Sequence, residues 1–373
     1  MHRALSSALT TVLLLAPLLL LPSAPATATP ASARVESTRA PSVAGATVYG
    51  ERLRVGPGRW DADEVDVAYR WLRDGEPVRG ATERTYVLDL ADLGARMSVQ
   101  VTATTPDGDR GRVVTEPTAR VRKAPLEARR SPSLRGEARF TRTVSATRGR
   151  WTTDPTRVRY QWLVGGAPVA GATGRRYAIR PEDVGRSLRV RVTAKAPGHT
   201  RGRAVSDPVR VQHRVPVRRT ATYSVTTRGR VGASVKTFKK LAQQTFDDPR
   251  GWRGKGVAFR RVASGGSFTL VLAEASAVPS FSSQCSSQWS CRVGRYVVIN
   301  QTRWQHASPA WNGAGRSLRD YRHMVVNHEV GHWLGKGHAS CPGPGRLAPV
   351  MMQQSKGTQG CRLNPWPTAA ELR

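Results

Sequence analysis

The chain has 373 residues, and its 59 Lys and Arg residues outnumber its 26 Asp and Glu residues to give a formal net charge of +33. Beyond the first 28 residues, no segment approaches the about 20 consecutive apolar residues of a membrane-spanning helix, which excludes a multi-spanning membrane protein. No nucleic-acid-binding motif accompanies the positive charge, so nucleic acid is not an expected partner.

Residues 1–28 are predicted to be a secretory signal peptide. Arg3 precedes an apolar run over residues 8–21, and Ala26-Thr27-Ala28 offers a cleavage site of the A-x-A type. We therefore expect a secreted protein, extracellular or associated with the cell wall, with no transmembrane helix in its mature chain. An uncleaved N-terminal anchor is the alternative. Residues 29–39 are rich in Ala, Ser and Thr and are expected to be a linker.

An internal repeat follows, with residues 40–121 as its first copy and residues 122–212 as its second. Apolar and polar residues alternate as they do in β-strands, and Asp74-Gly75 and Gly165-Gly166 mark equivalent turns. Each copy predicts an all-β sandwich that resembles the immunoglobulin-like repeats of exported bacterial surface proteins, and we expect the two to act as spacers or wall-binding arms. A shift of 91 residues aligns their aromatic residues without a gap: Trp60 with Trp151, Tyr69 with Tyr160, Trp71 with Trp162 and Tyr86 with Tyr177.

The positive charge is unevenly distributed between these copies. The first copy has 11 cationic and 13 acidic residues, whereas the second has 21 and 6. An arginine-rich coding bias accounts poorly for such a difference between two similar repeats. The asymmetry favours a basic surface for an anionic partner, such as cell-wall polymers, a membrane surface or an acidic substrate.

Residues 213–373 are expected to form one α+β domain. Ser234 predicts the start of a helix, and strands are expected over residues 257–262, 268–272 and 296–299, with residues 268–272 as the candidate edge of the sheet. A second helix is expected to begin at Ser317 and to continue through His332. His323 lies away from the apolar face of that helix and is expected to be exposed.

All four cysteines lie in this last domain. Four cysteines allow three disulfide pairings, and we favour the nearest-neighbour one, Cys285 with Cys291 and Cys341 with Cys361. A cysteine zinc site is the alternative, but the spacing lacks the C-x-x-C pattern of such sites.

Residues 328–338 read His-Glu-Val-Gly-His-Trp-Leu-Gly-Lys-Gly-His and match H-E-x-x-H-x-x-G-x-x-H, the zinc-site pattern of metzincin peptidases. On a helix, His328 and His332 point from one face and can bind one Zn²⁺, with Glu329 beside them. Gly335 permits the turn that would return His338 as the third ligand. The fourth tetrahedral position is expected to hold water, and Glu329 is predicted to take a proton from that water and to pass it to the leaving amine.

From about residue 221 to 367, the chain resembles a family of secreted metzincin-like domains of high-GC Gram-positive bacteria that is catalogued as a domain of unknown function. Supporting segments include residues 248–252 (Asp-Pro-Arg-Gly-Trp), 341–345 (Cys-Pro-Gly-Pro-Gly) and 349–354 (Pro-Val-Met-Met-Gln-Gln). The resemblance implies a zincin fold with one Zn²⁺ per chain. It also implies a methionine turn below the metal at Met351, with Met352 as the alternative.

Three functions are compatible with these features. The first is a secreted zinc endopeptidase that acts on peptides or proteins and is carried by its sandwich modules. The second is a zinc amidase that acts on peptidoglycan peptides. The third is a non-catalytic surface-binding protein with a vestigial zinc site. The endopeptidase is the preferred hypothesis.

Overall fold

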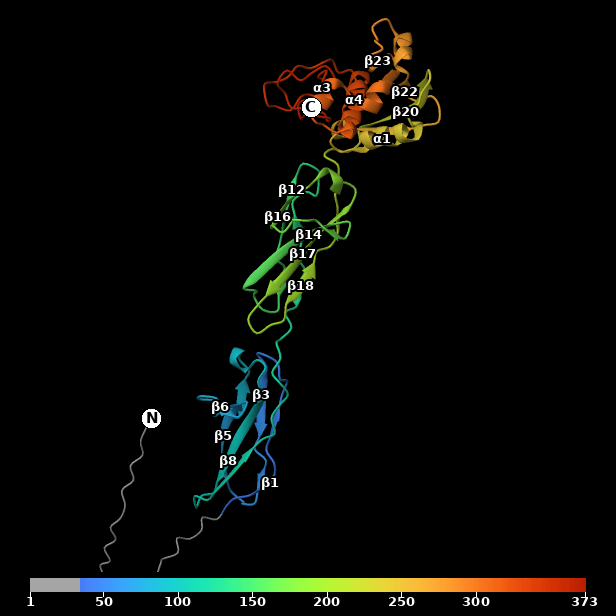
Figure 1. The fold of residues 1–373 in the computed structure, drawn as a ribbon. Helices are drawn as coiled ribbons and strands as arrows, with labels where there is room; N and C mark the ends of the chain where they lie inside the picture. Colours follow the sequence, from blue (N-terminus) through green and yellow to red (C-terminus); the bar gives the residue numbers. More distant parts are fainter. Residues whose placement is uncertain (1–33) are drawn as a thin grey trace, which may run out of the picture. The chain divides into compact units, whose positions relative to one another are not determined.

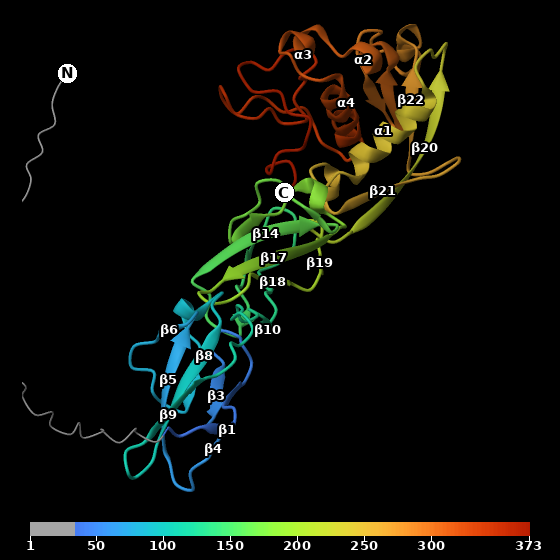
Figure 2. The same ribbon diagram turned by 60° about the horizontal axis from the view of Figure 1, so that its bottom comes forward.

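The computed structural model describes residues 34–373 (Figures 1 and 2). The predicted signal peptide and the first part of the predicted linker lie outside these residues. Contacts divide the chain into two compact units, one that ends at Arg122 and one that begins at Lys123. The first unit is a β-sandwich, and the second contains another β-sandwich and a domain of mixed helix and strand.

The first sandwich packs two antiparallel sheets around Trp71, which is fully buried with Val99 and Val101. One sheet has the order β2-β3-β7 and the other β6-β5-β8-β9, with the short pair β1-β4 and the 3-10 helix η1 beside them. The elements are β1 (Ser37–Arg39), β2 (Ser42–Ala44), β3 (Arg52–Gly56), β4 (Arg59–Trp60), β5 (Asp66–Arg73), β6 (Glu76–Pro77), β7 (Thr85–Val87), η1 (Leu90–Asp92), β8 (Met97–Thr104) and β9 (Arg110–Val114).

The start of this sandwich corrects the predicted linker over residues 29–39. Ser37 of β1 pairs with Trp60 of β4, and Val35 is only 7% exposed, so the domain begins before residue 40. A three-residue strand has too short an alternation to stand out in a stretch rich in small residues, which is why the composition suggested a linker.

The second sandwich repeats the first, which confirms the prediction of two all-β sandwiches. Trp162 stacks on Tyr177 with ring centroids 5.3 Å apart, as Trp71 does on Tyr86 at 5.4 Å. Its sheets have the orders β11-β12-β16 and β15-β14-β17-β18, with β19 also paired to β17. The elements are β10 (Ala128–Arg130), β11 (Leu134–Arg135), β12 (Thr143–Ala146), β13 (Arg150–Trp151), β14 (Arg157–Val164), β15 (Ala167–Pro168), β16 (Arg176–Ala178), η2 (Pro181–Asp183), β17 (Ser187–Lys195), β18 (Gly202–Val205) and β19 (Val209–Arg210).

The C-terminal domain is built on a five-stranded mixed sheet with the order β21-β20-β22-β24-β23. Four strands are parallel, and β23 runs antiparallel to β24 at one edge. The prediction that residues 268–272 form the edge was wrong, because β22 lies in the centre and all six of its residues are buried. A continuous apolar run is typical of a strand covered on both faces. The strands are β20 (Arg219–Arg228), β21 (Val257–Arg261), β22 (Phe268–Ala273), β23 (Cys291–Val293) and β24 (Tyr296–Asn300).

Helices cover one face of this sheet and enclose its main core. Ser234 caps α1 as predicted, since its hydroxyl accepts a hydrogen bond from the Thr237 amide, and Phe238 and Phe246 face the sheet. The opposite face packs against a 3-10 helix and the loop that follows it. The helices are α1 (Val235–Asp247), η3 (Trp252–Lys255), η4 (Ala275–Phe281), α2 (Gln301–His306), α3 (Pro309–Gly313) and α4 (Leu318–Trp333).

Two disulfides stabilise the loops of this domain, and they have the nearest-neighbour pairing. Cys285 is bonded to Cys291, and Cys341 is bonded to Cys361 in the irregular segment that follows α4. Disulfides of this kind persist in oxidising compartments, which agrees with an extracellular protein. No helix within residues 34–373 has the length and apolar character required to cross a membrane.

Candidate metal centre

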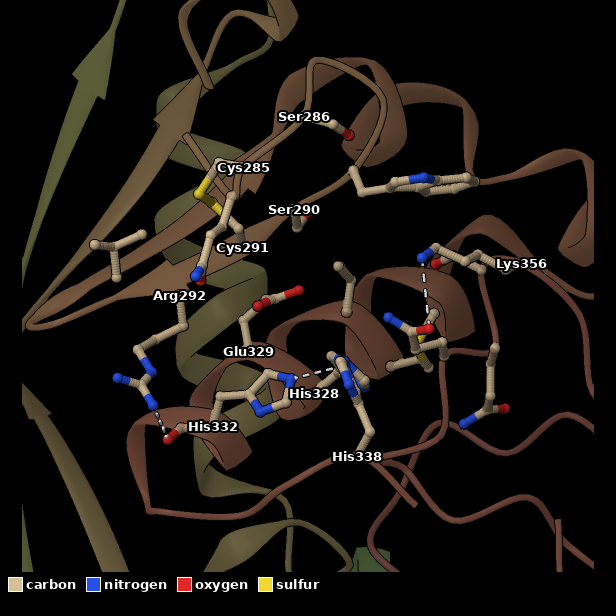
Figure 3. A pocket seen from close by; sticks show the side chains of 18 of the residues that line it. Cys285, Ser286, Ser290, Cys291, Arg292, His328, Glu329, His332, His338 and Lys356 are labelled. Carbon is tan, nitrogen blue, oxygen red and sulfur yellow. Dashed lines mark hydrogen bonds between the residues drawn. A yellow bond between two sulfur atoms is a disulfide. The ribbon is translucent and has the colours of Figure 1, made fainter. Parts of the chain in front are cut away.

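Helix α4 positions the first two histidines of the motif. The Ser317 hydroxyl accepts a hydrogen bond from the Asp320 amide and caps the helix, which ends after Trp333. His328 and His332 are one helical turn apart and point into the same pocket (Figure 3). Their ring centroids are 4.8 Å apart.

A tight turn after the helix brings the third histidine back. Gly335 has a φ of +84°, a backbone angle that favours glycine. His338 then lies close to the other two histidines, with its Nε2 atom 3.2 Å from Nε2 of His332. The candidate ligand atoms of the three residues lie within 4.8 Å of one another, so the cluster can hold one metal ion.

Backbone carbonyls fix the tautomers of the two helical histidines. Nδ1 of His328 lies 2.8 Å from the Val350 oxygen, and Nδ1 of His332 lies 2.8 Å from the Lys336 oxygen. A carbonyl only accepts hydrogen bonds, so each Nδ1 carries the proton and each Nε2 presents the lone pair that can bind a metal. Burial lowers the pKa of His328 to about 3 and also lowers the pKa of His332 and His338, which favours the neutral, metal-binding forms.

Glu329 shares the pocket but lies beside the histidine cluster. Its side chain is buried, and burial raises its pKa to about 8, while the positive charge of Arg292 acts in the opposite direction. Arg292 belongs to β23 and donates a hydrogen bond from its guanidinium to the backbone oxygen of His332, 3.1 Å away (Figure 3). It therefore connects the edge strand to the end of α4. The motif spacing gave no sign of this residue.

Met351 lies directly against α4 at Gly331, the residue that precedes His332. A Cβ atom added to Gly331 would lie 2.2 Å from the Met351 sulfur, so the sulfur occupies the space that a side chain would fill. Met352, the alternative, packs instead with Ala348 and Cys361. Methionine suits such a position because its side chain is flexible and polarisable.

The side chain of Glu371, near the end of the chain, stabilises the turn around Met351, a role that no sequence pattern indicated. Glu371 accepts hydrogen bonds from the Met351 amide at 2.8 Å and from the Val350 amide at 3.1 Å. Thr368 donates two further bonds to the same carboxylate, from its amide and its hydroxyl. Because the Val350 carbonyl accepts the bond from His328, Glu371 positions the carbonyl that orients a candidate ligand.

Replacing Glu371 with Gln is expected to weaken metal binding about 10- to 100-fold, as is typical when an outer partner of a metal site is lost. The neutral amide loses the charge-assisted bonds to the two turn amides, each worth about 1.5–3 kcal/mol. Competition titration against a chelator would measure the affinity. Glu274→Gln is the matched control, since Glu274 accepts a bond from the Arg230 amide elsewhere in the domain. Equal affinities of the two variants would contradict the role given to Glu371.

The pocket around these residues is bounded by the edge strand and by the first disulfide. Cys291, Arg292 and Val293 of β23 form one side of it. The residues on the other side come from α4 and from the segment after Met352. These are Tyr321, Met324, Val325, Gln353, Gln354, Ser355 and Lys356.

His323 does not belong to the pocket, and the prediction that it is exposed was wrong. It is 6% exposed, its Nδ1 atom lies 2.8 Å from the Thr245 hydroxyl of α1, and its ring packs on Trp366. The side of α4 opposite the pocket is therefore also covered. The segment after α4 returns over it, which the periodicity of one helix cannot reveal.

Comparisons with known proteins give one family match, over part of the chain, and no activity. Residues 216–365 match the family described as "Protein of unknown function (DUF3152)", and these residues correspond to the C-terminal domain. No curated protein matches the chain.

Among solved structures, the chain is similar to that titled "Crystal Structure of Rst D1-D2", at 16% identity over 48% of this chain and 99% of that chain, with a TM-score of 0.24. It is also similar to an amphioxus IgVJ-C2 molecule, at 14% identity over 40% of this chain and 90% of that chain, with a TM-score of 0.21. A third is a Ca²⁺-stabilised adhesin with which an Antarctic bacterium binds ice, at 11% identity over 47% of this chain and 49% of that chain, with a TM-score of 0.23. The match thus covers about half of that solved chain. The sandwich folds are established by their own strands and cores.

Proposed function

We propose that this protein is a secreted zinc endopeptidase with a metzincin-like C-terminal domain. One observation carries the proposal: three imidazoles with converging Nε2 atoms and one buried carboxylate, Glu329, face the same pocket beneath the edge strand β23. The two sandwiches would act as spacers or arms that hold the enzyme at the cell surface.

The donor set fits Zn²⁺. Three neutral histidines with an open fourth position are a common ligand set of catalytic zinc, whereas Ca²⁺ and Mg²⁺ prefer oxygen ligands. His328, His332 and His338 would hold the ion. Bound there, zinc would polarise the scissile carbonyl and lower the pKa of a water ligand to about 7.

The protein's own residues would bind the substrate and move the proton. In its ionised form, Glu329 would accept a proton from the attacking water and deliver it to the leaving amine. Strand β23 has β24 as its only partner strand in residues 34–373, so its other side can pair with an extended peptide. Such a peptide would lie along Cys291, Arg292 and Val293, which form one side of the pocket.

Removal of the metal is expected to abolish peptide cleavage, and one equivalent of Zn²⁺ is expected to restore it. Metal analysis of the purified full chain would give about one zinc per chain, and cleavage of a diverse peptide library would be followed before chelation, after chelation and after addition of zinc. Zinc without cleavage of any peptide would contradict the endopeptidase. Release of free amines from purified cell wall would then favour the amidase, and its absence would favour the non-catalytic surface protein. A protein without zinc would contradict both the endopeptidase and the amidase.

A further inference from the structure

The outer face of the larger sheet in the second sandwich carries a cluster of cationic side chains. Residues that pair across an antiparallel sheet share a face, so the register places one set of side chains outward. The inward set of β17 comprises Leu188, Val190, Val192 and Ala194, all buried. We call the outward cations the basic face: Arg157 and Arg159 of β14, Arg189, Arg191 and Lys195 of β17, and Arg203 of β18.

The six side chains of the basic face are accessible and carry no compensating charge. Four are exposed, and Arg189 and Arg191 are partly exposed. None of the six forms an ion pair with any residue of the described chain. Strands lie about 4.8 Å apart and alternate residues about 6.7 Å apart along a strand, so the charges form a compact band over three adjacent strands.

The first sandwich provides an internal comparison, because it has the same strands in the same register. Asp66 and Ala68 of β5 stand where the second sandwich has Arg157 and Arg159. Ser98, Gln100 and Thr104 of β8 stand where it has Arg189, Arg191 and Lys195. Of the six, only Arg203 has a cationic counterpart, Arg112 of β9. A coding bias toward arginine would affect both copies, and the fold requires no cation at these positions. Five of the six positions are therefore cationic in the second copy alone, which favours binding of an anionic ligand as the reason for these charges.

We propose that the basic face binds a linear polymer that carries phosphate groups outside the cell. Five of its six cations are arginines, whose planar guanidinium groups bind phosphate oxygens in pairs. A band of regularly spaced charges suits a chain with repeated anionic groups. The face lacks the aromatic side chains that anchor proteins at a membrane interface, which disfavours a lipid surface. This inference is independent of any activity at the histidine cluster.

The test measures binding of the full chain to long-chain inorganic polyphosphate as a function of salt concentration. The first variant is R157Q/R159Q/R189Q/R191Q/K195Q. The matched control, R129Q/R130Q/R135Q/R150Q/R176Q, removes the same charge from exposed residues on other strands of the same sandwich. We expect the face variant to bind about 100-fold more weakly at low salt. The plot of log K against log salt concentration should also become less steep, with the magnitude of its slope smaller by about 3, and the control should change far less in both respects.

A second variant, which adds these cations to the first sandwich, keeps the proposal testable if the face variant misfolds. D66R/A68R/Q100R/T104K builds most of the same band on exposed or partly exposed positions of the first sandwich and is expected to increase affinity for polyphosphate. Equal losses in the face variant and its control would overturn the proposal, since binding would then follow total charge. Equal binding of polygalacturonate would exclude phosphate recognition. Binding to phosphatidylglycerol vesicles or to duplex DNA in preference to polyphosphate would show that the ligand class is wrong.

Discussion

Replacing Glu329 with Gln is expected to lower kcat/KM for peptide cleavage by about two to four orders of magnitude and to leave the zinc content unchanged. The amide has almost the shape of the carboxylate, so the buried side chain keeps its place in the pocket. It cannot accept a proton, however, and the attacking water then has no base. The three imidazoles are untouched, since none of them forms a hydrogen bond with Glu329 among the interactions of residues 34–373.

Zinc analysis and cleavage assays on the same purified samples would check this result. Glu274→Gln makes the same chemical change at a carboxylate that does not line the pocket and is expected to retain full activity. If Glu329→Gln cleaves peptides at a rate within a factor of about ten of the wild-type rate, Glu329 is not the general base. Loss of zinc from this variant would instead show that the carboxylate supports the metal.

The local part of the candidate site could be predicted from the sequence, because it depends on spacing within one short segment. His328, Glu329 and His332 lie on one turn of helix, and Gly335 is the residue that the following turn requires. The contributions of Arg292 and Glu371 could not be predicted in this way. Each reaches the site through tertiary packing, one from an edge strand and one from the end of the chain, and neither belongs to a periodic pattern.

The same distinction between local spacing and tertiary packing determines which parts of the fold could be predicted. The aromatic residues shared by the two repeats predicted both sandwiches, since Trp71 and Trp162 occupy equivalent cores. The order of the strands in the C-terminal sheet could not be predicted from the sequence in the same way. The continuous apolar run of β22 is typical of a central strand, but only the observed pairing of the strands shows that β21 and β23 are the two edges of the sheet.

Replacing Gly331 with Val is expected to reduce the free energy of unfolding by about 3 kcal/mol and to weaken metal binding. A Cβ atom at this position would lie 2.2 Å from the Met351 sulfur and 2.8 Å from Cζ2 of Trp252. Neither neighbour has free space to move into, because Met351 and Trp252 are each only 1% exposed. The Trp252 indole also donates a hydrogen bond to the backbone oxygen of Asn327, and the Met351 amide donates one to the Glu371 carboxylate. Overpacking would therefore displace the turn that carries the Val350 carbonyl, the hydrogen-bond partner of His328.

Thermal melting and chelator competition would measure both effects, and a loss of about 3 kcal/mol corresponds to a decrease in Tm of about 6–12 °C for a domain of this size. Gly313→Val is the matched control, because Gly313 also lies in a helix and a Cβ there would meet nothing within 4 Å. The contact with Met351 is tested by the double variant Gly331→Val with Met351→Ala. Its destabilisation should be smaller than the sum of the two single effects, since removal of the sulfur relieves the clash. Additive effects, or equal Tm values for the Gly331 and Gly313 variants, would show that the close approach of Met351 to α4 does not limit the site.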